Sequence, residues 1–197
     1  MKVRNIIILI VVGLFNFTNL YAIDPEIFVQ STVNRASQVL SEKISKESKM
    51  IKLQEIAKDT VDIDGIGLYT LGQKRKSLND QEKKKYAELF NKYFLKTFSS
   101  RLAEYTNPEI DVLGKEVLNS KYTIVKSILM GTSERPEIKI DWRIYTKNSD
   151  KPVIRDLIIE GLSLARTQKE EFNSVLQNNN NDINELFKTL KSFIDKS

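Results

Sequence analysis

Residues 86–108 read YAELFNKYFLKTFSSRLAEYTNP, and they hold the clearest helical pattern in the sequence together with the proline that stops it. Apolar and aromatic side chains recur there at steps of three and four residues, which is the period of a helix with one buried face. Asn79 and Glu82 form a capping-box pattern before it, and Pro108 follows it. We therefore predict one long helix over residues 80–105. Its stripe consists of Tyr86, Leu89, Phe90, Tyr93, Phe94, Phe98, Leu102 and Tyr105.

This aromatic stripe admits two interpretations. A stripe at helical spacing is most often the buried face of a central core helix. Alternatively, part of it, and Phe94 and Phe98 in particular, lines an apolar cavity. Both roles require the same side-chain chemistry, so the pattern leaves the choice open.

Beyond Pro108 the period changes from helical to alternating, which predicts strands. The alternation is cleanest in the third strand, where Trp142 lies on one face and Asp141 and Arg143 lie on the other. Gly114 marks an expected bulge in the first strand. Successive strands of this kind predict an antiparallel meander in an α+β fold. The expected strands cover residues 109–118, 121–130, 135–144 and 153–160.

Two of these strands contain apolar runs in place of alternation. Residues 128–130 are Ile-Leu-Met, and residues 157–159 are Leu-Ile-Ile. An antiparallel strand with one face in water would alternate, so something apolar must cover both faces there. Either helices do so or one side faces a ligand cavity, and the runs alone do not decide.

The rest of the chain is mainly helical. Asp24 and Pro25 predict the start of the first helix, as its N-cap and its first residue. Residues 178–181 are asparagines that suit left-handed turns between two C-terminal helices. We find no repeat or second domain, so we predict a single domain over residues 23–197. Its other helices are expected at residues 48–61, 164–177 and 182–194, with a short one after Asp64.

The first 22 residues have the order of a secretory signal peptide. Lys2 and Arg4 give a positive start, an apolar core covers residues 6–17, and a small residue follows at Ala22. The apolar run is shorter than the roughly 20 residues that span a bilayer, so an uncleaved anchor is the less favoured alternative. We predict export, with no stable membrane anchor on the mature protein.

The composition excludes several kinds of site. The sequence contains no His and no Cys, which rules out Ser-His-Asp and Cys-His nucleophiles and His- or Cys-ligated zinc. No glycine-rich nucleotide motif occurs. Asp62 and Asp64 resemble a calcium loop only superficially, because the later ligands are missing, and a helix end followed by a turn is favoured. We expect no catalytic residue, no metal and no cofactor.

The charge balance is mildly basic. Removing residues 1–22 takes away two cations and no acid, which lowers the formal net charge from +5 to +3. The basic residues are spread along the chain, so the balance does not indicate a nucleic acid as partner.

The order of these pieces along the chain is the most informative feature. A signal peptide precedes a helical half, Leu71-Gly72 precedes the long helix ending in Tyr105, and a meander follows. The last strand runs DLIIEGLSL, residues 156–164, into a helix with Phe172. This order resembles the MlaC, or toluene-tolerance, family of periplasmic phospholipid-binding proteins across the whole mature chain, and residues 156–164 are its most specific part.

Three segments depart from the family pattern. Residues 73–76 stand where the family often has Trp, and residues 167–169 stand where it often has an aromatic-Arg pair. Residues 178–181 replace glycines. These departures concern head-group and partner contacts and leave the expected fold unchanged.

The resemblance implies a curved antiparallel sheet of about four strands, packed with helices around an apolar cavity for phospholipid tails. It also implies a periplasmic carrier, and not an enzyme, that shuttles phospholipid between an outer-membrane lipoprotein complex and an inner-membrane ABC transporter and so maintains outer-membrane lipid asymmetry. The expected cavity residues, each also suited to a plain core position, are Leu71, Phe94, Phe98, Val125, Ile128, Trp142, Ile144, Leu157, Ile159 and Leu162.

Two polar features carry hypotheses of their own. Ser163 is expected to cap the following helix, with a head-group contact as the alternative. The basic run Lys74, Arg75 and Lys76 is either a solvated helix start or a docking patch for anionic head groups or an acidic partner.

Two other function classes fit the same sequence. A periplasmic adaptor or chaperone would use an apolar groove to bind protein segments in place of lipid. A small hydrolase would need a pair of carboxylates, and no such pair is evident.

Overall fold

The computed structural model describes residues 22–196 except 134 and 149, so the predicted signal peptide lies outside the described residues apart from Ala22. The helices are α1 (Pro25–Ser41), α2 (Lys46–Thr60), α3 (Ile63–Thr70), the 3-10 helix η1 (Gly72–Lys76), α4 (Asp80–Leu102), α5 (Leu164–Asn178) and α6 (Ile183–Asp195). The strands are β1 (Ile110–Asn119), β2 (Tyr122–Leu129), β3 (Ile138–Tyr145), β4 (Val153–Ile159) and β5 (Leu162–Ser163).

The long helix α4 starts as the sequence predicts. The side chain of Asn79 accepts from the backbone N–H of Glu82, and the Glu82 carboxylate accepts from the Asn79 N–H, both at 2.9 Å. This capping box satisfies N–H groups that no helical carbonyl can reach. The helix ends at Leu102, three residues before the predicted end, because the hydrogen bonds there shorten to three-residue turns, such as the one from the Tyr105 N–H to the Leu102 carbonyl at 3.0 Å.

The sheet is an antiparallel meander in the order β1-β2-β3-β4-β5, which confirms the predicted α+β class. The expected bulge is also present, since the β1–β2 register shifts between Val112 and Gly114. The fifth strand was not predicted, because it has only two residues. It follows a two-residue turn in which Glu160 (φ 49°) and Gly161 (φ 82°) are both left-handed, the geometry of a tight hairpin.

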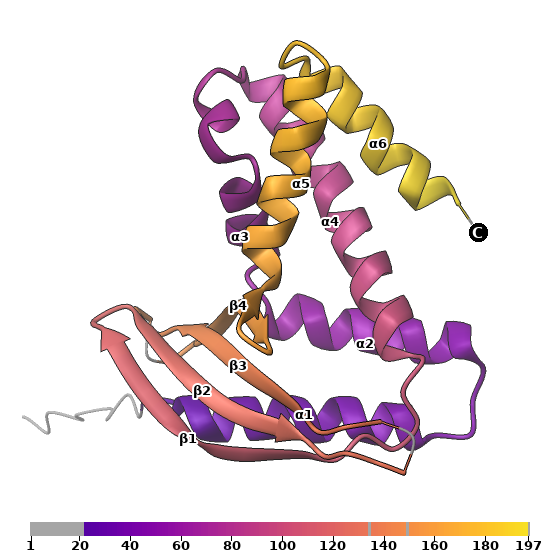
Figure 1. Ribbon diagram of the computed structural model, residues 1–197, viewed down its shortest axis with the longest axis vertical. Coiled ribbons are helices and arrows are strands. Elements are labelled where there is room, and N and C mark those ends of the chain that lie inside the picture. The colour runs from indigo at the N-terminus through magenta and orange to yellow at the C-terminus, as the bar shows by residue number, and fades with distance from the viewer. Residues whose placement is uncertain (1–21, 134, 149, 197) are drawn as a thin grey trace, which may run out of the picture.

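One face of the sheet is apolar and packs on α1, which runs along the lower side of the sheet in Figure 1. Ile140, Trp142 and Ile144 of β3 lie on this face, as the alternation predicts, and meet Val29 and Val33 of α1. We call these residues and the apolar side chains around them the sheet cluster. Its other buried members are Val125 and Ile154.

The helices α3, α4, α5 and α6 form a second body that rises from the β4 end of the sheet, and α2 runs across between the two (Figure 1). The core of this helical body is built around Tyr86 and Phe90 of α4 and Phe172 of α5, and we call it the helical cluster. The ring of Phe172 meets each of the other two rings edge to face. Val61, at the end of α2, packs against both clusters. The junction between sheet and helices therefore lies at Val61 and β4.

Candidate functional site

Three consecutive residues of β4 join the sheet to the helical body. The carbonyl of Ile154 accepts a hydrogen bond from the N–H of Asp62 at 3.0 Å, beside a β-bridge between Val61 and Ile154. Arg155 and Asp156 make the next two connections, to α3 and to α5. These three residues supply the connections that β4 makes to the helical body, and the packing of α2 between α1 and α4 adds to them.

The Asp62 carboxylate has two partners. Its Oδ1 accepts from the Gly65 N–H at 2.8 Å and caps α3, and its Oδ2 forms an ion pair with the Arg155 guanidinium, 2.5 Å from Nε. Asp62 therefore follows the end of α2, as expected, and also caps the start of α3. A Cβ added to Gly65 would lie 2.5 Å from Asp62 Oδ2 and 2.9 Å from Arg155 Cζ, so a larger residue would collide with the ion pair.

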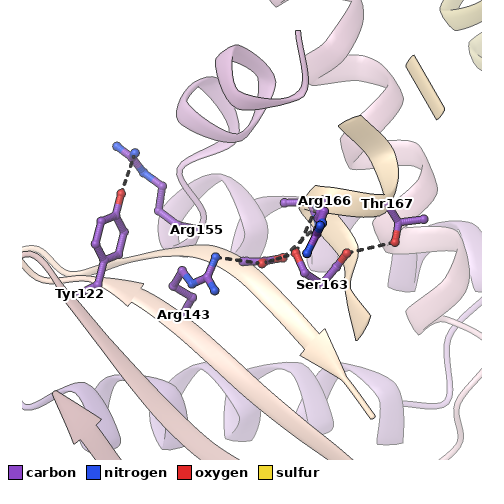
Figure 2. Close-up of polar contacts among 8 residues, drawn as sticks. Tyr122, Arg143, Arg155, Ser163, Arg166 and Thr167 are labelled. Atoms are coloured by element: carbon purple, nitrogen blue, oxygen red, sulfur yellow. Dashed lines mark hydrogen bonds and ion pairs between the residues drawn. The ribbon is translucent and has the colours of Figure 1, made fainter. Parts of the chain in front are cut away.

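The Arg155 side chain extends over the polar face of the sheet (Figure 2). Its Cζ lies 4.4 Å from the centre of the Tyr145 ring, within range of a cation–π contact. Its Nη1 reaches the hydroxyl of Tyr122 at 3.5 Å. Two aromatic rings and one carboxylate thus fix the orientation of this arginine.

Asp156 holds the start of α5. It is 3% exposed and accepts from the Ser163 hydroxyl at 2.6 Å and from the Ala165 N–H at 3.0 Å, while Arg143 forms an ion pair with it at 3.4 Å (Figure 2). Ser163 in turn accepts from the Arg166 N–H at 3.1 Å, so its predicted role as N-cap is confirmed. The Asp156 carboxylate can be buried here because these contacts replace the hydrogen bonds with water that it loses.

Most of the sheet residues predicted to line a cavity lie on the apolar face. Val125, Trp142 and Ile144 are buried in the sheet cluster, and Leu157 packs against it half-buried. The indole N–H of Trp142 is satisfied internally by Ser127 at 2.8 Å. These residues therefore belong to the buried part of the apolar face.

The apolar face continues toward the β4–β5 turn, where its cover thins. Ile159 pairs directly with Ile140 on one side and with Leu162 on the other, so the three share this face. Ile159 is half-buried and Leu162 is 59% exposed. We call the incompletely covered part of the face the apolar strip. It consists of Leu129, Ile138, Leu157, Ile159 and Leu162.

Phe94 and Phe98 lie on successive turns of α4 and stack with their ring centroids 5.8 Å apart. Both are half-buried and pack against the helical cluster, whereas Leu71 is fully buried within it. Leu71 therefore occupies a core position. The two phenylalanines keep exposed ring surface that a ligand can cover.

The structure does not bring Ile128 together with the other candidates. It pairs with Lys139 of β3, on the polar face that also carries Asp141 and Arg143. Surface hollows of about 400 Å³ lie along α1, at Asn34, and beside α6, at Phe193, away from the apolar strip.

The predicted docking run lies in η1. Arg75 and Lys76 are exposed, and Arg75 donates to the carbonyl of Leu68 at 3.3 Å. Within the described residues, neither they nor Lys74 forms an ion pair with a carboxylate. The backbone N–H of Asn184 and, more weakly, the charge of Lys74 lower the pKa of Asp182, so this carboxylate offsets part of the Lys74 charge, while Arg75 and Lys76 keep theirs for a partner.

The sequence did not predict the ion pairs through which Asp62, Arg155 and Arg143 help to join the sheet to the helical body. Their signal was weak, because charged residues on a strand's polar face are ordinary. Leu129 and Ile138 were missed as members of the strip, although they share the face of Trp142 and alternation could have found them.

The described residues contain no group of three or more acidic side chains that could hold a metal ion. None of the helices within the described part of the chain is long and apolar enough to cross a membrane.

The comparisons with known proteins give a fold from one solved structure and a family from one family model. A phospholipid-binding protein from Ralstonia solanacearum, solved in complex with a phospholipid, superposes with a TM-score of 0.73 over 87% of this chain and 97% of that one. The two are 15% identical, so this likeness shows the fold. The comparison with curated proteins gives no match. The family model of the MlaC protein matches residues 30–192, and the chain therefore belongs to the MlaC family.

Proposed function

We propose that this protein binds a phospholipid and carries it through the periplasm, between an outer-membrane lipoprotein complex and an inner-membrane ABC transporter. Two comparisons support the lipid: membership of the MlaC family, and the fold shared with a protein solved in complex with a phospholipid. Export by the signal peptide of residues 1–22 and a role in outer-membrane lipid asymmetry belong to the same proposal.

The observation that carries the proposal is the apolar strip. Its residues lie on the face that the sheet buries against α1, yet Leu157 and Ile159 are only half-buried and Leu162 is exposed. An antiparallel sheet normally buries such a face or makes it polar. Acyl chains along the strip would complete its cover, and the half-exposed rings of Phe94 and Phe98 on α4 are a second candidate contact for lipid.

The energetic demand explains why the site is apolar. A phospholipid has about thirty chain methylenes, and exposing them to water costs on the order of 25 kcal/mol at about 0.8 kcal/mol each. A carrier must hide most of this surface while it crosses an aqueous compartment. That task needs no catalytic group, metal or cofactor, so we propose a binding protein and not an enzyme.

The test is transfer of a fluorescent phospholipid between donor and acceptor vesicles by the mature protein. Leu162→Asp places a carboxylate on the strip at a position that is already 59% exposed, so the fold is retained. We expect its transfer rate to fall at least about tenfold, because a charge beside acyl chains loses hydration.

Leu113→Asp is the matched control. Leu113 has the same side chain and is 62% exposed, but it lies on β1, at the far edge of the sheet. Its transfer rate should equal that of the wild type. Equal loss in both variants, or loss in neither, would refute the strip as the lipid site.

A further inference from the structure

The 3-10 helix η1, which carries the basic run, lies at the end of the helical body away from the sheet (Figure 1). Two exposed apolar side chains precede it in the sequence. Leu68 is 51% exposed and Tyr69 is 41% exposed, both near the end of α3. The other face of α3 is buried, with Gly67 packed so closely on Phe90 that a Cβ there would lie 2.8 Å from the ring. The fixed orientation of α3 therefore directs Leu68 and Tyr69 outward.

Two cations contact this pair, and two more lie next to one of them in η1. Lys74, Arg75 and Lys76 follow it in η1, and Arg75 folds back to donate to the carbonyl of Leu68 at 3.3 Å. Lys169 of α5 lies with its Nζ 5.2 Å from the centre of the Tyr69 ring. Arg75 and Lys169 therefore lie next to exposed apolar side chains.

A glycine in the turn between α3 and η1 allows Lys169 to lie close to the basic run. Gly72 has φ +55°, a conformation that residues with a Cβ seldom adopt. A Cβ at Gly72 would also lie 3.1 Å from Cε of Lys169. The glycine thus lets the chain reverse while Lys169 approaches the basic run.

Acids near this surface cancel only part of its positive charge. Asp182 interacts with Lys74 across space, and the two acids that follow η1 are engaged elsewhere. Asp80 forms an ion pair with Lys83, and the Glu82 carboxylate accepts from the backbone of Asn79. In the part of the chain that the structure describes, no carboxylate forms an ion pair with Lys74, Arg75, Lys76 or Lys169.

We propose that Leu68, Tyr69, Lys74, Arg75, Lys76 and Lys169 form a docking surface for an anionic lipid bilayer. Cations next to such a bilayer are attracted by its head groups, and tyrosine and leucine enter the interface between head groups and chains. An acidic protein surface would need an apolar patch of its own beside the acids to cover Leu68 and Tyr69, whereas a bilayer offers both groups everywhere along its surface. The inference rests on the proposed carrier function, since docking serves loading or delivery of lipid.

The experiment is sedimentation of the mature protein with vesicles of phosphatidylcholine alone or of equal parts phosphatidylcholine and phosphatidylglycerol. The variant with Lys74→Glu, Arg75→Glu and Lys76→Glu should bind the anionic vesicles about 100-fold more weakly at low salt. Each cation beside an anionic surface contributes a factor of about five. Replacing the apolar pair by Leu68→Ser and Tyr69→Ser should cost about tenfold, and this loss should persist at high salt, where charge is screened.

The control reverses three other exposed lysines and so changes net charge equally. It combines Lys121→Glu, Lys147→Glu and Lys151→Glu, in the turns of the sheet. The control should retain most of the wild-type binding. Equal loss in both triple variants would mean that net charge alone drives binding, and the proposal would be wrong.

Two further outcomes separate the possibilities. If the η1 variant keeps vesicle binding but no longer binds an acidic polypeptide such as polyglutamate, the surface docks a protein and the bilayer proposal is wrong. Phospholipid bound to each purified variant is measured in parallel. It should be equal in wild type and η1 variant, and its absence from both would overturn the carrier function on which docking depends.

Discussion

The carboxylate of Asp62 caps the first turn of α3 and at the same time forms an ion pair with Arg155 of β4, 2.5 Å from its Nε. One side chain therefore ties the helical body to the sheet and starts a helix. The two side chains are 23% and 30% exposed, so water screens the pair only partly. This pairing joins the two bodies on the polar face of the sheet, the face opposite the apolar strip.

A double-mutant cycle tests that pairing. Asp62→Asn keeps an effective cap but removes the charge, and Arg155→Met keeps the stem of the side chain. We expect a coupling energy of about 1 kcal/mol in urea unfolding, because both groups are largely buried. The pair Arg35–Asp59 on the surface, 44% and 61% exposed, is the control and should couple by less than about 0.5 kcal/mol. Equal coupling in both cycles would contradict the proposed role of Asp62.

Removing the Asp156 side chain should lower the free energy of unfolding more than removing that of Asp62. Asp156→Ala leaves the Ala165 N–H and the Ser163 hydroxyl without their acceptor, and we expect the free energy of unfolding to fall by about 3 kcal/mol. Ser163→Ala, which removes only the cap, should cost about 1 kcal/mol. Asp111→Ala at an exposed position of β1 is the control. A loss below 1 kcal/mol for Asp156→Ala would show that its contacts stabilise little.

Stability should fall in alkali through Tyr86. The ring is 2% exposed, its hydroxyl lies 2.8 Å from Thr70 Oγ1, and burial raises its pKa above the usual range. Above about pH 10 the unfolded chain releases this proton while the folded chain keeps it, so the unfolded state binds fewer protons and the free energy of unfolding falls as pH rises. Unfolding of Tyr86→Phe should depend less steeply on pH in that range. An unchanged slope would rule out Tyr86 as the cause.

Truncation at Phe98 should weaken the stabilisation that lipid gives, whereas truncation at Phe90 should cost the same with and without lipid. Phe90 is 2% exposed in the helical cluster, so Phe90→Ala should lower the free energy of unfolding by about 3–5 kcal/mol with or without lipid. Phe98 is half-buried, and in delipidated protein Phe98→Ala should cost clearly less than that. A ligand that binds the folded state raises its stability, so the gain on adding phospholipid should be smaller in Phe98→Ala than in wild type. An equal gain would exclude Phe98 from the lipid site.

The parts of the fold that depend on neighbours in sequence could be predicted. The capping box of Asn79 and Glu82, the alternation around Trp142 and the cap at Ser163 are local signals, and each is confirmed. The pairing of Asp62 with Arg155 could not be predicted, because it joins segments far apart in the chain and follows from how β4 docks on α3.

In the candidate site, too, some features could be predicted from the sequence and others depend on contacts between distant segments. Apolar composition singled out Leu157 and Ile159, but strand register was needed to place Ile128 on the opposite face. Composition also could not separate Leu71, which is fully buried, from Phe98, which is half-buried. Burial depends on which helices meet, and that is a property of the whole fold.

The most direct test of the central claim is mass spectrometry of solvent extracts from the purified mature protein. The account predicts phospholipid in stoichiometric amount with the wild type and with Leu113→Asp, and a clear loss with Leu162→Asp. Repeated absence of phospholipid from the wild type, with binding of peptide segments intact, would contradict lipid carriage and support a periplasmic adaptor.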